Sequence, residues 1–156
     1  MRKKRIMIVG AGRSGKTTLA NFLEGGGEIR RIPNMVYRSV TLDTPGPYLE
    51  SPWMQNHLIA AAQDASCILM LADASGVRQV YPPEFAKAFR VPIFGVITKC
   101  DHPDADREAA AKDLMQAGVI PPYYEISVTD PGGMECLKEA LLPFWPVRGE
   151  PTKSVI

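Results

Sequence analysis

The chain has 156 residues, of which 46% are hydrophobic and 22% charged, and its formal net charge is +1. This length suits one domain with a buried core, and no apolar run approaches the ~18 residues that a membrane span needs. The small net charge argues against nucleic acid as the main partner, because binding to a phosphate backbone needs a basic excess on one face.

Short apolar runs alternate with segments of helical periodicity along the chain. Strands are predicted at residues 6–9, 35–42, 67–72, 92–98 and 123–127. Helices are predicted at residues 17–23, 53–65, 83–89, 105–117 and 134–144. This alternation indicates a three-layer α/β domain, with a mainly parallel central sheet and helices on both faces.

We expect this domain to occupy residues 1–145. Residues 146–156, where proline and glycine recur without periodicity, are expected to form a loosely ordered C-terminal tail. Cys67, Cys100 and Cys136 lie far apart and form no Cys-x-x-Cys pair. Free thiols fit a reducing compartment, so we expect a cytoplasmic protein.

The loop between the first strand and the first helix carries the strongest functional signal. The motif G-x-x-x-x-G-K-[ST] is matched in full by Gly10, Ala11, Gly12, Arg13, Ser14, Gly15, Lys16 and Thr17. Such a loop turns consecutive backbone N–H groups towards phosphate, and the helix N-terminus adds partial positive charge. The motif therefore predicts a nucleotide-binding P-loop that continues into Thr18.

Two residues of this loop are the candidate catalytic groups. Lys16 is expected to contact the β- and γ-phosphates, and Thr17 is expected to offer its hydroxyl to Mg²⁺. We expect the Lys16 side chain to be exposed in the empty pocket and to make no contact with the core.

Asp43-Thr44-Pro45-Gly46 closes the predicted strand at residues 35–42. A carboxylate at the end of a strand can hold Mg²⁺ through water, and a glycine N–H can bind a γ-phosphate. Alone, the tetrapeptide is an ordinary strand exit, but its combination with a P-loop favours a phosphate site. We assign Asp43, with Thr17, to the metal and Gly46 to the nucleotide.

Thr98-Lys99-Cys100-Asp101 follows another apolar strand. The Asp101 carboxylate can accept hydrogen bonds from guanine N1–H and the 2-amino group, and the Lys99 stem can lie over the purine face. Asn is usual in the first position of this motif, where its amide braces the P-loop. Thr98 lacks the amide, and loss of such a hydrogen bond costs about 1 kcal/mol. A solvated acidic loop residue is the alternative to guanine recognition.

Ser127 and Val128 follow the last predicted strand, where nucleotide-binding domains of this type place a loop against the base. We include both in the candidate nucleotide site. An ordinary strand exit is an equally good interpretation of this weak match.

Together, these motifs resemble the Ras-like G domains of Era-like small GTPases. The run at residues 43–50 resembles, more narrowly, the EutP/PduV family of ethanolamine- and propanediol-utilisation proteins, which are encoded with bacterial microcompartments. The resemblance covers about residues 5–144. It implies a P-loop NTPase fold, Mg²⁺, and GTP or GDP as ligand, with ATP as the alternative. It also implies a microcompartment location, with shell or enzyme proteins as partners. A dimer is compatible with this resemblance.

The sequence departs from ordinary GTPases where water is usually activated. The usual switch threonine position falls near Ile32, and Pro47 stands where Ras-type enzymes carry a water-positioning glutamine. Glu50 and His57 lie nearby, but a surface acid and a solvated helix histidine are the favoured interpretations. We therefore expect slow GTP hydrolysis.

Three functions are consistent with these residues. The first is a GTP-binding regulator or assembly factor with slow hydrolysis. The second is an ATP-dependent phosphotransferase, because the family resemblance carries an acetate kinase assignment. Lys16, Mg²⁺ and Arg13 would neutralise the transferred phosphate, although a solvated loop residue is the favoured interpretation of Arg13. The third is a non-catalytic nucleotide-binding assembly module.

Overall fold

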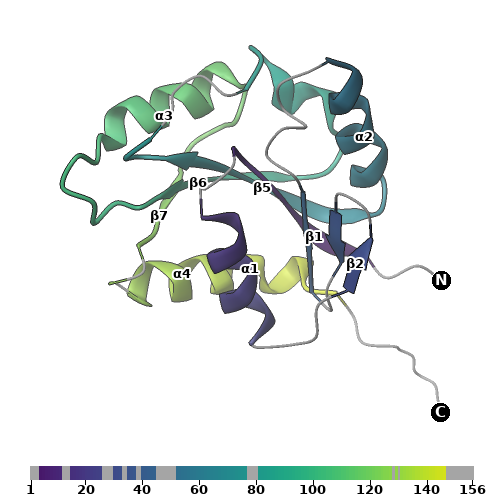
Figure 1. Ribbon diagram of the computed structural model, residues 1–156, viewed down its shortest axis with the longest axis horizontal. Coiled ribbons are helices and arrows are strands. Elements are labelled where there is room, and N and C mark those ends of the chain that lie inside the picture. The colour runs from purple at the N-terminus through teal and green to yellow at the C-terminus, as the bar shows by residue number, and fades with distance from the viewer. Residues whose placement is uncertain are drawn as a thin grey trace.

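The computed structural model describes residues 4–11, 15–25, 30–32, 35–37, 40–44, 52–76, 81–127, 129 and 131–146. Within them the chain forms a seven-stranded sheet in the order β2-β3-β4-β1-β5-β6-β7, flanked by helices on both faces (Figure 1). Apart from Pro146, the predicted C-terminal tail lies outside the described residues, so the predicted domain boundary stays an expectation.

The strands are β1 (Arg5–Val9), β2 (Arg30–Ile32), β3 (Met35–Tyr37), β4 (Thr41–Asp43), β5 (Ala65–Asp73), β6 (Ile93–Thr98) and β7 (Tyr124–Glu125). The helices are α1 (Lys16–Glu24), α2 (Pro52–Ala62), α3 (Arg107–Gln116) and α4 (Pro131–Leu141), with short 3₁₀ turns η2 (Phe85–Ala88) and η3 (Leu142–Phe144). None of the described helices is long and apolar enough to cross a membrane.

Alternating side chains of the central strands supply two cores, one on each face of the sheet. Met7 and Val9 of β1 pack with Leu58 of α2 and Leu114 of α3. On the other face, Ile6 and Ile8 pack with Leu19 of α1 and Leu137 of α4. Figure 1 shows the same division, with α2 and α3 on one side of the sheet and α1 and α4 on the other. The predicted three-layer arrangement is therefore confirmed.

The pairing of the strands is mainly parallel, as predicted. Strands β4, β1, β5, β6 and β7 run parallel to one another. Because their carboxyl ends meet at one edge, the loops that follow β1, β4, β5 and β6 converge there. This edge positions the candidate site.

The predicted single strand at residues 35–42 was wrong. It is two strands, β3 and β4, that pair antiparallel, and β3 also pairs antiparallel with the unpredicted β2. The apolar residues of this run share one alternation, so the sequence pattern does not separate the two strands. The dipeptide Pro33-Asn34 was the available signal for the β2–β3 hairpin, because both residues favour turns.

The predicted helix at residues 83–89 was also wrong, since only the 3₁₀ turn η2 forms. Backbone N–H groups of Glu84 and Ala86 donate to the carbonyls of Gln116 and Ala117 at the end of α3, at 2.8 and 2.7 Å. These bonds hold the segment against α3, and Glu84 enters η2 with a left-handed φ of 60°. The local apolar pattern reflects this packing rather than a helical repeat.

Smaller differences concern the ends of elements. Helix α2 stops at Ala62, because Ala65 already belongs to β5. Helix α3 begins at Arg107 because Asp106 is its N-cap and accepts a hydrogen bond from the Ala109 N–H at 3.0 Å.

Candidate nucleotide-binding site

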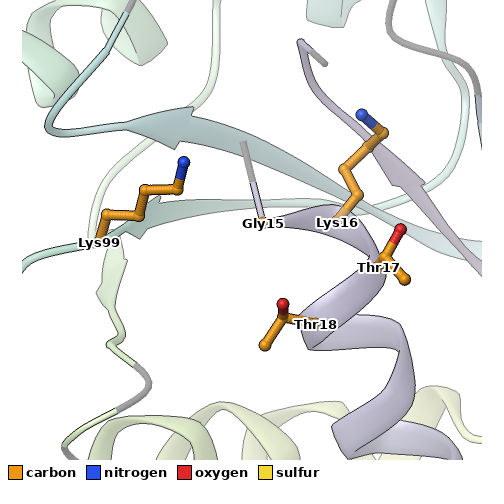
Figure 2. A pocket seen from close by; sticks show the side chains of 5 residues that line it. All are labelled: Gly15, Lys16, Thr17, Thr18 and Lys99. Atoms are coloured by element: carbon orange, nitrogen blue, oxygen red, sulfur yellow. The ribbon is translucent and has the colours of Figure 1, made fainter. Parts of the chain in front are cut away.

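A pocket of about 280 Å³ opens at the carboxyl edge of the sheet, lined by Gly15, Lys16, Thr17, Thr18 and Lys99 (Figure 2). Gly15 is the N-cap of α1, the next three residues form its first turn, and Lys99 follows β6. The pocket therefore joins the P-loop motif with the Thr98–Asp101 motif. Figure 2 shows Gly15 between the Lys16 and Lys99 side chains.

Gly15 allows the P-loop to turn into α1. Its φ of 100° is in the left-handed region, where a side chain would be strained, and it is the N-cap of α1 without a side-chain cap. The first amides of a helix have no intrahelical acceptor. The start of α1 thus offers N–H donors and partial positive charge to an anion.

Lys16 is buried, which corrects the expectation of an exposed side chain. The residue is only 8% exposed, and its Nζ donates to the carbonyls of Gly10 and Ala11 at 2.9 and 2.8 Å. Burial lowers the pKa of Lys16, and the negative charge of Asp43 opposes this shift. The P-loop backbone therefore holds the ammonium in place.

Thr17, which lines the pocket, lies beside Asp43. Thr17 Oγ1 donates to Asp43 Oδ2 at 3.4 Å, and Asp43 is 8% exposed at the end of β4. A hydroxyl and a carboxylate are hard oxygen donors, and Mg²⁺ usually binds through one or two carboxylates plus phosphates and water. The donor set therefore fits Mg²⁺. No group of three or more His, Cys, Asp or Glu residues suited to a metal occurs in the described part of the chain.

Thr98 supports the P-loop by contact rather than through an amide. Its side chain is 3% exposed, and its Cβ lies 3.6 Å from the position that a Cβ on Gly15 would take. Its Oγ1 donates to the Ala72 carbonyl at 3.5 Å, a long bond. Thr98 therefore lies close to the P-loop at Gly15, without the amide that an asparagine would carry.

Asp73 was not singled out from the sequence. It ends β5 in register with Thr98, and its Oδ2 lies 3.1 Å from Lys99 Nζ. The N–H and hydroxyl of Ser75 donate to Asp73 Oδ1 at 2.8 and 2.7 Å. An acid followed two residues later by serine, directly after a buried strand, was the available signal for this turn.

Tyr81 is a second residue that the motifs did not reveal. It is 7% exposed, and its hydroxyl lies 2.6 Å from the Leu71 carbonyl and 3.1 Å from the Val9 carbonyl. Burial raises its pKa, so the hydroxyl stays protonated and can donate. Because Val9 directly precedes Gly10, this contact connects β5 to the start of the P-loop.

The remaining candidates are not brought into the pocket lining. Asp101 is exposed on the turn two residues after Lys99, and Ser127 is buried with its Oγ 3.3 Å from Thr129 Oγ1. His57 is exposed on α2. Several other candidates lie outside the described residues: Gly12, Arg13, Ser14, Gly46, Pro47, Glu50 and Val128.

Comparison with known proteins identifies the family. The profile of PduV-EutP, described as "Ethanolamine utilisation - propanediol utilisation", matches residues 3–142. The chain belongs to this family. It is 29% identical over 131 residues to propanediol utilization protein PduV of Citrobacter freundii, covering 83% of this chain and 87% of that protein. It is 32% identical over 144 residues to the probable acetate kinase EutP of Escherichia coli (strain K12), covering 88% and 89%.

Solved structures with the same fold include nucleotide complexes. Era of Aquifex aeolicus bound to GDP and AlF₄⁻ has a TM-score of 0.60 and 23% identity, over 96% of this chain and 59% of that one. SelB of Methanococcus maripaludis with the GTP analogue GPPNHP has a TM-score of 0.57 and 23% identity, over 92% of this chain and 34% of that one. The expected Era-like P-loop GTPase fold of this PduV-EutP protein is therefore confirmed.

Proposed function

We propose that this PduV-EutP protein binds a guanine nucleotide with Mg²⁺ and hydrolyses GTP slowly, as a regulator or assembly factor. The observation that carries the proposal is the pocket at the start of α1, which combines Lys16 and Thr17 with Lys99 from the base-recognition motif. The ligands bound in the Era and SelB structures, GDP and a GTP analogue, support it.

The phosphate end of the ligand would lie against Lys16. A lysine ammonium has three N–H donors, and the carbonyls of Gly10 and Ala11 take two of them. One donor is then left for a phosphate oxygen, in a fixed direction. A bound anion would also offset the cost of burying this ammonium, so the site favours highly charged phosphates.

Thr17 and Asp43 would hold Mg²⁺ beside the phosphates. Bound there, the ion would neutralise charge on the β- and γ-phosphate oxygens. The ion would lie beside the Thr17 hydroxyl of α1 and the Asp43 carboxylate of β4, which contact each other. Gly46, after β4, is assigned to the γ-phosphate from the sequence motif alone.

The base would lie between Lys99 and Asp101. Asp101 is exposed, so its carboxylate is accessible to guanine N1–H and the 2-amino group. Lys99 already lines the pocket and offers its stem to the purine face. Ser127 and Val128 remain further candidates for the base from sequence position.

Hydrolysis is expected to be slow, because no group is assigned to orient a water. Pro47 replaces the usual glutamine and can neither donate a hydrogen bond nor orient water. The family description supports a role in ethanolamine or propanediol utilisation. We propose microcompartment shell or enzyme proteins as its partners. Such a partner, or a second copy, could supply the missing group.

A second function is favoured by one specific observation. The relative from Escherichia coli is named a probable acetate kinase. In that case Lys16 would position ATP, and a small carboxylate would attack its γ-phosphorus, releasing ADP and forming an acyl phosphate. The candidate Asp101 contacts favour GTP over ATP, which is why we place this function second.

Single-turnover phosphate release separates the two functions. We expect the isolated protein to release phosphate from GTP more slowly than about one turnover per minute, the scale of unassisted GTPases, with no response to millimolar acetate. The measurement uses GTP and ATP in parallel, each with and without acetate, and quantifies acetyl phosphate.

Two results would contradict this proposal. Acetate-dependent formation of acetyl phosphate from ATP would establish the kinase instead. Rapid phosphate release from GTP alone would mean that a catalytic group is present, and Glu50→Gln would be the first variant to test.

A further inference from the structure

Two lysines line the same pocket. The pocket must therefore distinguish the phosphate end of a nucleotide from its base end. Lys16 and Lys99 both contribute to the lining, on either side of Gly15 (Figure 2). Two equivalent cations would compete for the same phosphates. The structure contains a difference between them, since Lys99 alone forms a close ion pair with Asp73.

The ion pair is well supported by its surroundings. Asp73 Oδ2 lies 3.1 Å from Lys99 Nζ, and the Asp73 side chain is 13% exposed, against 38% for Lys99. Ser75 donates twice to the other carboxylate oxygen. A Cβ on Gly76 would lie 2.8 Å from Oδ2, so a side chain at residue 76 would displace this oxygen from its position.

The backbone of Lys99 directs its side chain to this pair. Lys99 has a left-handed φ of 59°, a conformation that costs a non-glycine residue about 1–2 kcal/mol. The turn is held by Ala74 N–H donating to the Thr98 carbonyl at 3.0 Å and His102 N–H donating to the Lys99 carbonyl at 3.1 Å. These two hydrogen bonds therefore keep the Lys99 backbone in its left-handed conformation.

The charge state of Asp73 fits this arrangement. Burial alone would raise its pKa, but the hydrogen bonds from Ser75 and the nearby Lys99 ammonium keep the pKa below its ordinary value. Asp73 is therefore ionised at neutral pH.

We propose that Asp73 is a positioning and specificity residue, which holds the Lys99 ammonium on the rim and neutralises it. The stem of Lys99 is then fixed for the base, while Lys16 remains the cation that attracts phosphate. This inference rests on the proposed function and deepens it, because it explains how one pocket recognises both the base and the phosphates of a nucleotide.

The test compares two ligands, GTP and inorganic tripolyphosphate, titrated into wild type and Asp73→Asn with excess Mg²⁺. In Asp73→Asn, GTP binding should weaken by about three- to tenfold, because a half-buried ion pair no longer positions Lys99. Tripolyphosphate binding should tighten by about two- to fivefold, because the released ammonium adds to Lys16. Opposite shifts are a result that general damage to the loop cannot produce.

Two further variants complete the design. Lys99→Gln removes the cation instead, and should weaken GTP binding without tightening tripolyphosphate binding. Glu84→Gln is the matched control, because it neutralises an acid in the exposed Lys87–Glu84 pair, whose N–O distance is 3.2 Å, and should bind both ligands as wild type does.

The outcomes distinguish this proposal from the proposed function. Equal weakening of both ligands in Asp73→Asn, or unchanged binding of both, would overturn the role of Asp73 while leaving nucleotide binding intact. Wild-type protein that binds tripolyphosphate as tightly as GTP would contradict guanine recognition; tighter tripolyphosphate binding by Asp73→Asn would then support the charge role alone. Wild-type protein that binds neither ligand would contradict both proposals.

Discussion

Lys16→Ala should weaken GTP binding at least about 100-fold, since truncating one partner of a buried charge pair commonly costs 3–5 kcal/mol. The mutation removes an ammonium that the P-loop carbonyls of Gly10 and Ala11 hold in place before any ligand arrives. Calorimetric titration with GTP and Mg²⁺ measures the loss. Thermal unfolding of the same variant reports whether the fold survives.

The burial of Lys16 makes two controls necessary. Lys16→Met keeps most of the side-chain volume and removes only the charge. It should therefore weaken GTP binding by as much as Lys16→Ala does. Lys112→Ala removes an exposed lysine of α3 and should bind GTP like wild type. Binding by Lys16→Met within about tenfold of wild type would contradict the phosphate role of this lysine, because a lost charged hydrogen bond alone costs about 1.5–3 kcal/mol.

Asp101→Asn should exchange one base preference for another. The carboxylate accepts two hydrogen bonds from guanine, and the amide presents a donor instead, which suits the 2-oxo group of xanthine. We expect GTP binding to weaken about 10- to 100-fold and xanthosine triphosphate to bind more tightly than GTP, as two charge-assisted hydrogen bonds at an exposed site imply. Competition between the two nucleotides measures the exchange directly.

Asp104→Asn is the matched control for this substitution. Asp104 is exposed in the same turn and lies three residues beyond Asp101, so it undergoes the same chemical change without a proposed base contact. Its nucleotide preference should equal that of wild type. If Asp101→Asn weakened GTP and xanthosine triphosphate equally, Asp101 would have no role in reading the base.

The parallel core of the fold was predictable because its signals are local. Each buried strand is a short apolar run, and the motif at Gly10–Thr17 follows a strand and precedes a helix. The β2–β3 hairpin was missed because its strands have three residues each and their apolar pattern merges with that of β4. Short antiparallel strands depend on cross-strand pairing, which periodicity along the chain does not report.

The candidate site was predictable in its residues but not in its contacts. The motifs predicted Lys16, Thr17, Asp43 and Lys99. In the structure Thr17 contacts Asp43, and Lys99 lines the pocket at the P-loop. Burial of Lys16 depends on carbonyls that turn back towards it, which a motif does not encode. The Asp73–Lys99 pair joins the ends of two neighbouring strands, so only the register of β5 and β6 reveals it.

Selection of a guanine nucleotide by this pocket can be tested by calorimetric titration of the wild-type protein with GTP and with ATP. With Mg²⁺ we predict saturable GTP binding and ATP binding weaker by at least about 100-fold, because adenine would leave the Asp101 carboxylate without its donors. Removing Mg²⁺ with a chelator should weaken GTP binding, through loss of the ion at Thr17 and Asp43. ATP binding as tight as GTP binding would contradict selection of guanine by this pocket.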